Sequence, residues 1–187
     1  MKQKVSDYIA EYIAQWGIRD VFTVTGGGAM HMNDAFGHHK MLHCTYQHHE
    51  QACAMAAEAY ARLGNKMAAV CVTTGPGATN AITGVLGAWM DSIPMLVFSG
   101  QARYATTVSA SGLPLRSMGV QECNIVPVVK SLTKYAHMIV HPENIRYHLE
   151  KALYLAVNGR PGPVWLDIPL DVQGAVIETD DLKAYDP

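Results

Sequence analysis

Apolar residues near the N-terminus recur at the spacing of one helix face. They are Val5, Tyr8, Ile9, Tyr12, Ile13 and Trp16. Gly17 follows them, at the place where glycine commonly ends a helix. The pattern predicts an amphipathic helix that ends at this glycine.

Short apolar runs rich in β-branched residues then alternate with stretches of helical character. The predicted strands are Val21–Val24, Leu42–Tyr46, Met67–Thr73, Pro94–Phe98 and Val164–Ile168, and the predicted helices are His49–Leu63, Ala78–Met90 and Glu143–Val157. Continuous apolar strands are typical of a parallel sheet that helices cover on both faces. We therefore predict an α/β fold with a doubly wound, mostly parallel sheet, and a ligand site outside the C-terminal ends of its strands.

Two stretches depart from this alternation. Residues Ala102–Gly119 are rich in Ser, Thr, Ala and Gly, which predicts a long mobile loop of the kind that often serves function. From Gln173 onward the chain turns acidic and ends on Pro187. We expect one domain over residues 1–172 and a linker toward a further, central domain over 173–187.

The composition narrows the range of partners. Hydrophobic residues make up 49% of the 187 residues and charged residues only 16%, which predicts a face buried against other protein. The net charge of −2 gives no electrostatic reason to expect nucleic acid or an anionic membrane surface. The N-terminal segment carries charges among its apolar positions, so we expect neither a signal peptide nor a membrane span.

The four cysteines, Cys44, Cys53, Cys71 and Cys123, form no C-x-x-C pair. The first three lie within or beside apolar runs, where free thiols pack as small hydrophobes. We expect all four to be reduced, at least three to be buried, and the protein to be cytoplasmic.

Two glycine-rich turns follow predicted strands. Gly26-Gly27-Gly28 lets a backbone without Cβ atoms approach a ligand, but His31 stands where a dinucleotide motif needs glycine, so a plain tight turn is the alternative. Gly75-Pro76-Gly77 lacks the Lys-Ser/Thr ending of a phosphate-binding loop. Alone, it predicts only a strand-to-helix turn.

Glu50 lies at a strand-to-helix junction beside small and apolar residues. Such surroundings favour the protonated form of a carboxyl group, which suits proton exchange near neutral pH. The alternative is a helix N-terminal Glu that is favoured only by the helix dipole. The neighbouring histidines, His38, His39, His43, His48 and His49, do not show metal-ligand spacing, so we expect no metal site.

Seven motifs in order carry a family resemblance. They are His49-Glu50-Gln51, Ala59-Tyr60-Ala61-Arg62, Thr74-Gly75-Pro76-Gly77-Ala78-Thr79-Asn80, Met90-Asp91-Ser92-Ile93-Pro94, Ser99-Gly100-Gln101, Gln121-Glu122, and Gly159 to Pro169. From about Val5 to Val172 the chain resembles the N-terminal domain of the acetolactate synthase family of thiamine-diphosphate enzymes. In that family this domain holds the aminopyrimidine of the cofactor. A separate C-terminal domain of the partner subunit holds the diphosphate through a metal ion, Mg²⁺.

The resemblance implies a role for each matching residue. Glu50 would hydrogen-bond the pyrimidine ring nitrogen and activate the cofactor for reaction with a 2-keto acid, and Gln121 would reach the reacting centre. The remaining cofactor contacts would come from Thr25, Gly26, Gly27, Pro76 and Asn80, and Arg160 matches an arginine that contacts FAD in members that carry it, or is a surface arginine on a turn. Two subunits would share each site, so we expect a homodimer or tetramer.

Several positions depart from the family pattern near the expected substrate. These are Val24, Thr25, Val120 and Leu170, and the loop Ala102–Gly119 is also longer than usual. A different 2-keto acid or acceptor aldehyde therefore stays open. Simple decarboxylation of a 2-keto acid and a non-catalytic binding module of the same fold are the alternatives, although Glu50 argues against the second. No Gly-Asp-Gly segment followed by Asn is present to hold the diphosphate, so we expect the chain to be inactive alone.

Overall fold

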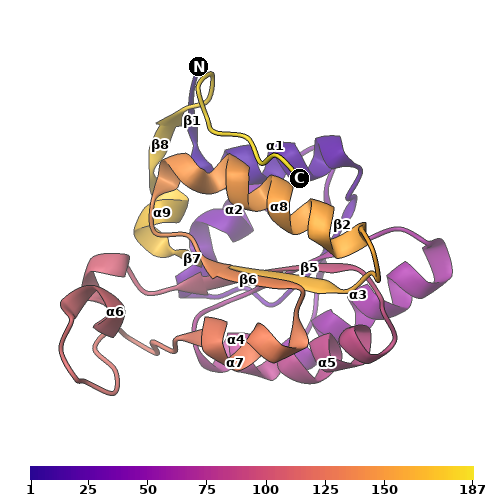
Figure 1. Cartoon of the computed structure of the whole chain (residues 1–187), viewed down its shortest axis with the longest axis horizontal. Helices are drawn as coiled ribbons and strands as arrows, with labels where there is room; N and C mark the ends of the chain where they lie inside the picture. The colour runs from indigo at the N-terminus through magenta and orange to yellow at the C-terminus, as the bar shows by residue number, and fades with distance from the viewer.

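A six-stranded parallel sheet forms the centre of the protein in a computed structural model that describes residues 1–187 (Figure 1). Its strand order is β3 (His43–Tyr46), β2 (Asp20–Thr23), β4 (Ala69–Val72), β5 (Met95–Gln101), β7 (Pro163–Pro169) and β6 (Tyr135–Met138). Every neighbouring pair is parallel. Strands β4, β5 and β7 are buried along their whole length, as their apolar runs predict.

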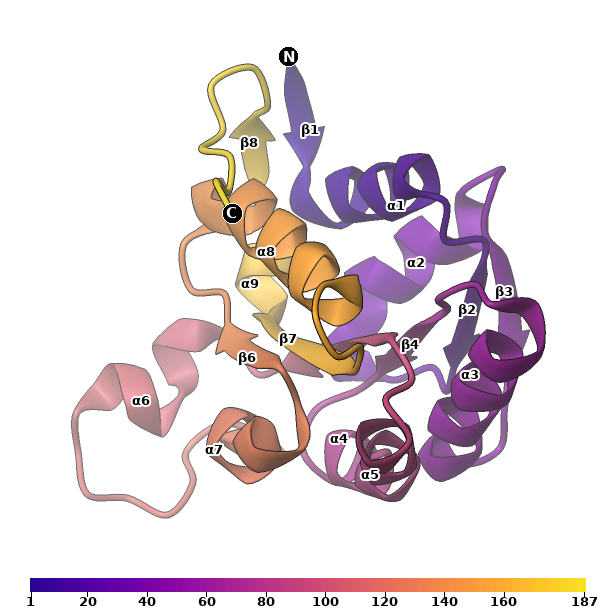
Figure 2. The ribbon, with the colours of Figure 1, turned by 45° about the vertical axis from the view of Figure 1, so that its right-hand side comes forward.

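Helices cover both faces of this sheet (Figures 1 and 2). One face carries α1 (Val5–Trp16), α2 (Met30–His38), α8 (Ile145–Val157) and α9 (Leu170–Gly174), and the other carries α3 (Glu50–Gly64), α4 (Pro76–Asn80), α5 (Ile82–Met90) and α7 (Ile125–Val129). Two apolar clusters fill the layers. Alternate residues of one strand serve different clusters, as with Cys71 and Val72 of β4. The doubly wound α/β fold is thereby confirmed.

The first helix agrees with its prediction in detail. α1 buries Val5, Ile9 and Ile13 and ends at Gly17, whose φ of 110° is readily adopted only by glycine. The predicted helix Ala78–Met90 instead begins earlier and is divided into α4 and α5. Pro76 is the reason for the earlier start, because proline is favoured in the first turn of a helix.

Several features were not predicted from the sequence, among them the helices α2, α7 and α9. β6 is a short, half-buried edge strand, and β1 (Lys2–Lys4) pairs antiparallel with β8 (Val176–Glu178). The stretch Ala102–Gly119 contains the 3₁₀ helix η2 (Tyr104–Thr106) and the short helix α6 (Val108–Ser111). Further single turns of 3₁₀ helix are η1 (Gly27–Ala29), η3 (Lys130–Leu132) and η4 (Pro142–Asn144).

The last fifteen residues lie against the domain in this structure. Gln173 is fully buried and donates hydrogen bonds to the carbonyl oxygens of Gly28 and Ile168, both at 2.7 Å. The backbone N–H of Tyr185 donates to Glu150 Oε2 at 2.6 Å. The expected linker role of residues 173–187 stays a prediction. No helix combines the length and the apolar character that crossing a lipid bilayer requires.

Candidate cofactor site

The strand order reverses between β2 and β4. From β2 the chain moves to β3 on one side and then returns to β4 on the other. The crevice outside the carboxyl ends of strands at such a reversal is where open α/β sheets bind ligands. The turns that meet here are Thr25–Gly28 after β2, Gln47–Glu50 after β3 and Thr73–Asn80 after β4.

The turns after β2 and β4 pack against each other through glycine. A Cβ atom on Gly26 would lie 2.5 Å from Thr73 Cβ, and one on Gly28 would collide with Thr74 Oγ1. The backbone N–H of Gly28 donates to Thr73 Oγ1 at 3.0 Å. Glycine is therefore required at these positions, because the turns after β2 and β4 approach each other closely. Thr25 lies exposed at the start of the turn after β2.

Glu50 is the first residue of α3 and points toward α4. Its Oε2 accepts a hydrogen bond from Asn80 Nδ2 at 3.0 Å, while its Oε1 has no hydrogen-bond partner in the chain. A Cβ atom on Gly77 would come within 3.2 Å of that Oε1. The N-cap residue His49 accepts from the N–H of Gln51 through Nδ1 at 3.1 Å, which fixes the start of the helix. The start of α3 and the turn after β4 thus meet at one carboxylate.

Pro76 and Asn80 begin and end α4, one helical turn apart. Gly75 precedes them with φ of 59°, and a Cβ atom at this position would collide with the carbonyl oxygen of Gln121. Gln121 itself has a positive φ of 56°, which is uncommon for a residue other than glycine. The structure therefore brings the segment that carries Gln121 directly against the turn after β4.

A cavity of about 360 Å³ lies between these turns and the start of the 102–119 segment. It is lined by Gly27, Thr74, Gln101, Arg103, Val120 and Gln121, among others. Leu170 also lines it, so two of the positions that depart from the family pattern, Val120 and Leu170, face the same space. The sequence predicted a functional loop around this cavity but assigned no role to Arg103.

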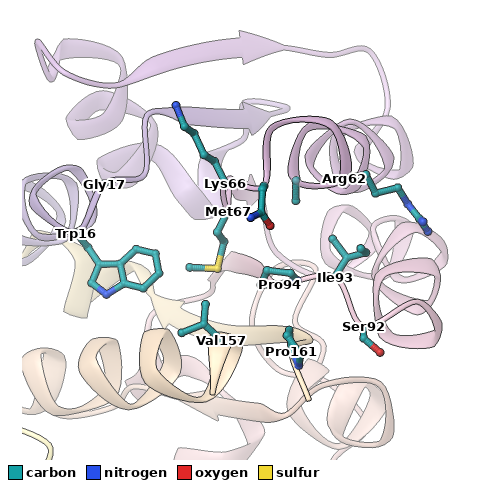
Figure 3. A pocket seen from close by; sticks show the side chains of 12 residues that line it. Trp16, Gly17, Arg62, Lys66, Met67, Ser92, Ile93, Pro94, Val157 and Pro161 are labelled. Atoms are coloured by element: carbon teal, nitrogen blue, oxygen red, sulfur yellow. The ribbon is translucent and has the colours of Figure 1, made fainter. Parts of the chain in front are cut away.

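Arg160 lies at the opposite edge of the sheet, because it precedes β7 whereas the cavity lies after the strands end. Its Nε donates to Ser92 Oγ at 2.6 Å, and its second guanidinium nitrogen lies 3.4 Å from the carbonyl oxygen of Met90. It is therefore not brought together with Glu50. A cavity of about 580 Å³ at this amino-terminal edge is lined by Trp16, Arg62 and Pro94 (Figure 3). Arg62 is already paired with Glu58 and Asp91.

A buried polar network behind the site was not predicted as functional. Asp167, completely buried on β7, accepts hydrogen bonds from Ser99 Oγ at 2.5 Å and from Gln101 Nε2 at 3.1 Å. Burial outweighs these two hydrogen bonds and raises the pKa of Asp167 to about 7. Trp165 Nε1 donates to the same Ser99 oxygen at 2.8 Å. The sequence signals for this network are the polar residue in an otherwise apolar strand and the two family motifs that contain its members.

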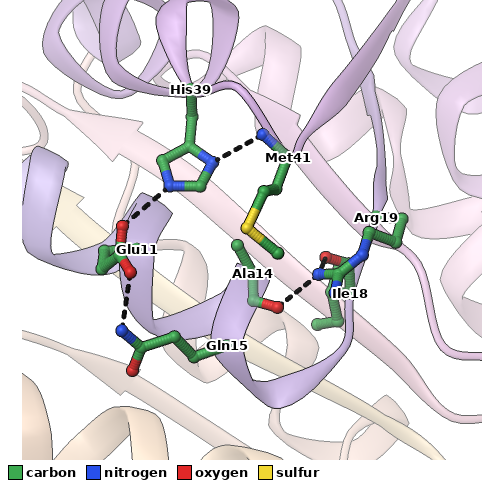
Figure 4. A network of polar contacts seen from close by, with 7 residues as sticks. All are labelled: Glu11, Ala14, Gln15, Ile18, Arg19, His39 and Met41. Atoms are coloured by element: carbon green, nitrogen blue, oxygen red, sulfur yellow. Dashed lines mark hydrogen bonds and ion pairs between the residues drawn. The ribbon is translucent and has the colours of Figure 1, made fainter.

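One member of the histidine group ties two helices together. His39 Nε2 lies 3.0 Å from Glu11 Oε2, and His39 Nδ1 accepts from the N–H of Met41 at 3.3 Å (Figure 4). The hydrogen bonds from His39 and Gln15 lower the pKa of Glu11. No group of three or more His, Cys, Asp or Glu side chains is placed to hold a metal ion.

All four cysteines are free, and the prediction that at least three of them are buried is wrong. Cys53 and Cys71 are buried, but Cys44 and Cys123 are half-exposed. Burial raises the pKa of the Cys53 thiol to about 12, with a further contribution from Glu50. Cys44 differs because β3 is an edge strand of the sheet and is covered less well than β4.

The fold and the site define a cofactor-binding domain, and comparison with known proteins identifies it. Residues 3–114 match the model of the thiamine pyrophosphate enzyme N-terminal TPP binding domain. The chain belongs to this family. It is 36% identical over 174 residues to acetolactate synthase 2, chloroplastic, of Zea mays, and 35% identical over 174 residues to acetolactate synthase, chloroplastic, of Arabidopsis thaliana. Each alignment covers 91% of this chain but only 26% and 24% of the relative, about a quarter of its length.

The same relatives correct the expected location. Their names place them in the chloroplast, so the prediction of a cytoplasmic protein is contradicted. The physical reason is that reduced cysteines report the redox state of a compartment and do not distinguish one reducing compartment from another.

Proposed function

We propose that the protein containing this chain joins 2-keto acids with thiamine diphosphate, as in acetolactate synthesis, and that Glu50 activates the cofactor. The observation that carries the proposal is the carboxylate of Glu50, held by Asn80 at the strand-order reversal with one oxygen left unpaired. When bound, thiamine diphosphate supplies the electron sink for bond formation next to a carbonyl group.

The residues of the site fit the aminopyrimidine end of this cofactor. Asn80 fixes Oε2 of Glu50, so Oε1 is left to share a proton with a ring nitrogen. Glycines at positions 26 and 77 let the turns pack closely around Thr73, and a Cβ atom on Gly77 would also lie 3.2 Å from Oε1 of Glu50. Pro76 and the backbone of Thr25 and Gly27 border the same crevice and would limit the position of the ring.

Other parts of the proposal rest on the resemblance and on the surface of the domain. We propose a homodimer or tetramer in which α3 and α5 contribute to the contact, because they pack together and expose Met55, Leu86 and Met90. Mg²⁺ would be held with the diphosphate outside this chain. FAD, where present, would meet Arg160 at the edge of the sheet away from Glu50.

The decisive experiment replaces Glu50 with Gln in the full-length protein. The amide keeps the size of the side chain but cannot exchange a proton, so turnover of pyruvate should fall by about 10²–10⁴-fold. Exchange of the C2 proton of bound thiamine diphosphate with deuterium, followed by NMR, should slow in parallel.

Glu58→Gln is the matched control, because Glu58 lies on the same helix but is paired with Arg62. It should leave the exchange rate unchanged. If Glu50 only complements the helix dipole, Glu50→Gln costs about 0.3–1 kcal/mol of stability and exchange is unaffected, which would contradict the proposal. Analysis of the product from pyruvate separates carboligation from simple decarboxylation.

A further inference from the structure

The cavity between the turns and the 102–119 segment has one charged residue in its wall, Arg103. The arginines that form ion pairs in this protein are Arg62 and Arg146, and Arg103 is not among them. No carboxylate of Asp or Glu lines the cavity. The charge of this guanidinium is therefore not neutralised by the chain itself.

The backbone of Arg103 is fixed on both sides. Its carbonyl oxygen accepts from the N–H and the Oγ1 of Thr106, both at 2.9 Å. The preceding N–H, of Ala102, donates to Gln101 Oε1 at 3.0 Å, and the following N–H, of Tyr104, donates to Asp171 Oδ1 at 3.0 Å. The sequence predicts a mobile loop here, but this first part of it is held in place.

Gln101 links the two sides of the cavity. Its Oε1 holds the backbone next to Arg103, while its Nε2 donates to the carbonyl oxygen of Cys123 at 2.7 Å, two residues after Gln121. Gln101 is only 1% exposed, and its amide is oriented by Asp167. One buried side chain thereby sets the distance between Arg103 and Gln121.

The wall of the cavity also contains an unpaired polar group. Thr74 is 3% exposed, and its hydroxyl has no hydrogen-bond partner in the chain. An unpaired buried hydroxyl favours a polar occupant. Together with the free guanidinium of Arg103, this hydroxyl makes the cavity suited to a small anion that has further hydrogen-bonding oxygens.

We propose that Arg103 binds the carboxylate of the 2-keto acid substrate, an inference that rests on the proposed function. The planar guanidinium can donate two parallel hydrogen bonds to a carboxylate, which fixes the direction of the ligand as well as its charge. The same cavity is bordered by Gln121 and by the turns that approach Glu50. Arg103 therefore selects acids over neutral carbonyl compounds at this site.

The test compares Arg103→Gln with Arg116→Gln in the full-length protein. Arg116 is exposed in the same segment and does not line the cavity. Arg103→Gln should raise the KM for pyruvate roughly 10–100-fold, the loss expected for hydrogen bonds to a charged group, with little change in kcat. The inhibition constant of oxamate, an unreactive analogue with the same carboxylate, should rise in parallel. Arg103→Lys keeps the charge and should recover part of the loss.

Three outcomes would overturn the inference. They are an unchanged KM in Arg103→Gln, an equal rise in Arg116→Gln, and a loss of C2 proton exchange in Arg103→Gln, which would place the damage at the cofactor. Failure of the proposed function gives a different result. In that case the wild-type protein turns over no 2-keto acid, or exchanges its C2 proton no faster than the Glu50→Gln variant.

Discussion

The central sheet presents different kinds of surface at the carboxyl ends of its strands and at their amino ends, which we call its carboxyl-terminal and amino-terminal edges. The carboxyl-terminal edge has a cavity of about 360 Å³, an unpaired hydroxyl on Thr74, a free oxygen on Glu50 and positive φ angles at Gly75 and Gln121. The amino-terminal edge has a cavity of about 580 Å³. The two arginines at this edge are already engaged, since Arg62 is paired with two carboxylates and Arg160 is hydrogen-bonded to Ser92, whereas Lys66 is exposed and forms no ion pair.

On the proposed function, cavity size alone would select the wrong edge. Unpaired polar groups and strained backbone cost free energy, so a protein retains them where a ligand compensates for them. The unpaired Thr74 hydroxyl lies at the strand-order reversal, whereas positive φ angles of residues other than glycine occur at both edges, at Gln121 and at Asn65 and Ser92. The predictions below test whether the two edges differ in energy and function as this argument requires.

The largest difference should come from equivalent glycine substitutions at the two edges. Gly75→Ala places a methyl group against the carbonyl oxygen of Gln121 at a φ of 59°, so strain and overpacking should cost about 3–6 kcal/mol. Gly159→Ala also has a positive φ, of 66°, but nothing lies within 4 Å of its Cβ, so about 1 kcal/mol is expected. Urea unfolding of both variants measures the gap, and equal costs would contradict the close packing of the turns.

A pH-dependent effect should appear at Asp167, behind the site. Its pKa is about 7 in the folded protein and about 3.9 in the unfolded chain. Between these two pH values the folded protein therefore binds more protons at this carboxyl group than the unfolded chain does. This contribution to stability is complete below pH 4 and is lost as the pH rises through 7, by up to roughly 4 kcal/mol. Asp167→Asn cannot titrate, so its stability relative to the wild type should improve between pH 5 and pH 8. Asp181→Asn, at an exposed position, is the control and should show no such trend.

A smaller effect is expected at Glu122, which anchors the 102–119 segment. Its carboxylate accepts backbone hydrogen bonds from Val108, Met118 and Gly119, at 2.7, 3.0 and 2.9 Å. Burial raises the pKa of Glu122, but these three donors outweigh it and the net pKa is lowered, so the anchor should weaken as the pH falls through that pKa.

Glu122→Gln should loosen the segment by about 1 kcal/mol, because the amide has a single acceptor oxygen and no charge, and so leaves at least one of these partly exposed donors without its partner. Hydrogen exchange of the three amides measures this, with the exposed Glu143→Gln as control. Unchanged protection of the amides would show that the segment does not depend on Glu122.

The sequence predicted the core of the fold because its strands are long apolar runs. Central strands such as β4 and β5 are buried on both faces, so their composition alone indicates them. The edge strand β6 (Tyr135–Met138) is half-buried and mixes aromatic, polar and apolar residues, and so gives little periodic signal. The pair of β1 with β8 joins the two ends of the chain, and no local pattern predicts such a long-range contact.

The candidate site likewise has parts that the sequence predicts and parts that it does not. Glu50 and the glycine turns were found because motif and strand position agree, and their convergence follows from parallel topology. The sequence assigned Arg103 no role, since that role depends on the path of a segment without periodicity, and it placed Gln101 in a motif without showing the contacts that Gln101 makes. The burial of Cys44 was overestimated because its strand lies at the edge of the sheet.

The smallest effect should come from Arg62 at the amino-terminal edge. Its guanidinium contacts Glu58 Oε1 at 2.6 Å and also pairs with Asp91, but its side chain is 43% exposed. Solvent screens such pairs, so Arg62→Gln should cost at most about 1 kcal/mol and less at high salt. Turnover and C2 proton exchange of the full-length protein should not change, because the larger cavity at this edge has no role in the proposed reaction. A loss of turnover in a variant with an unchanged melting temperature would assign function to the amino-terminal edge and end the contrast between the two.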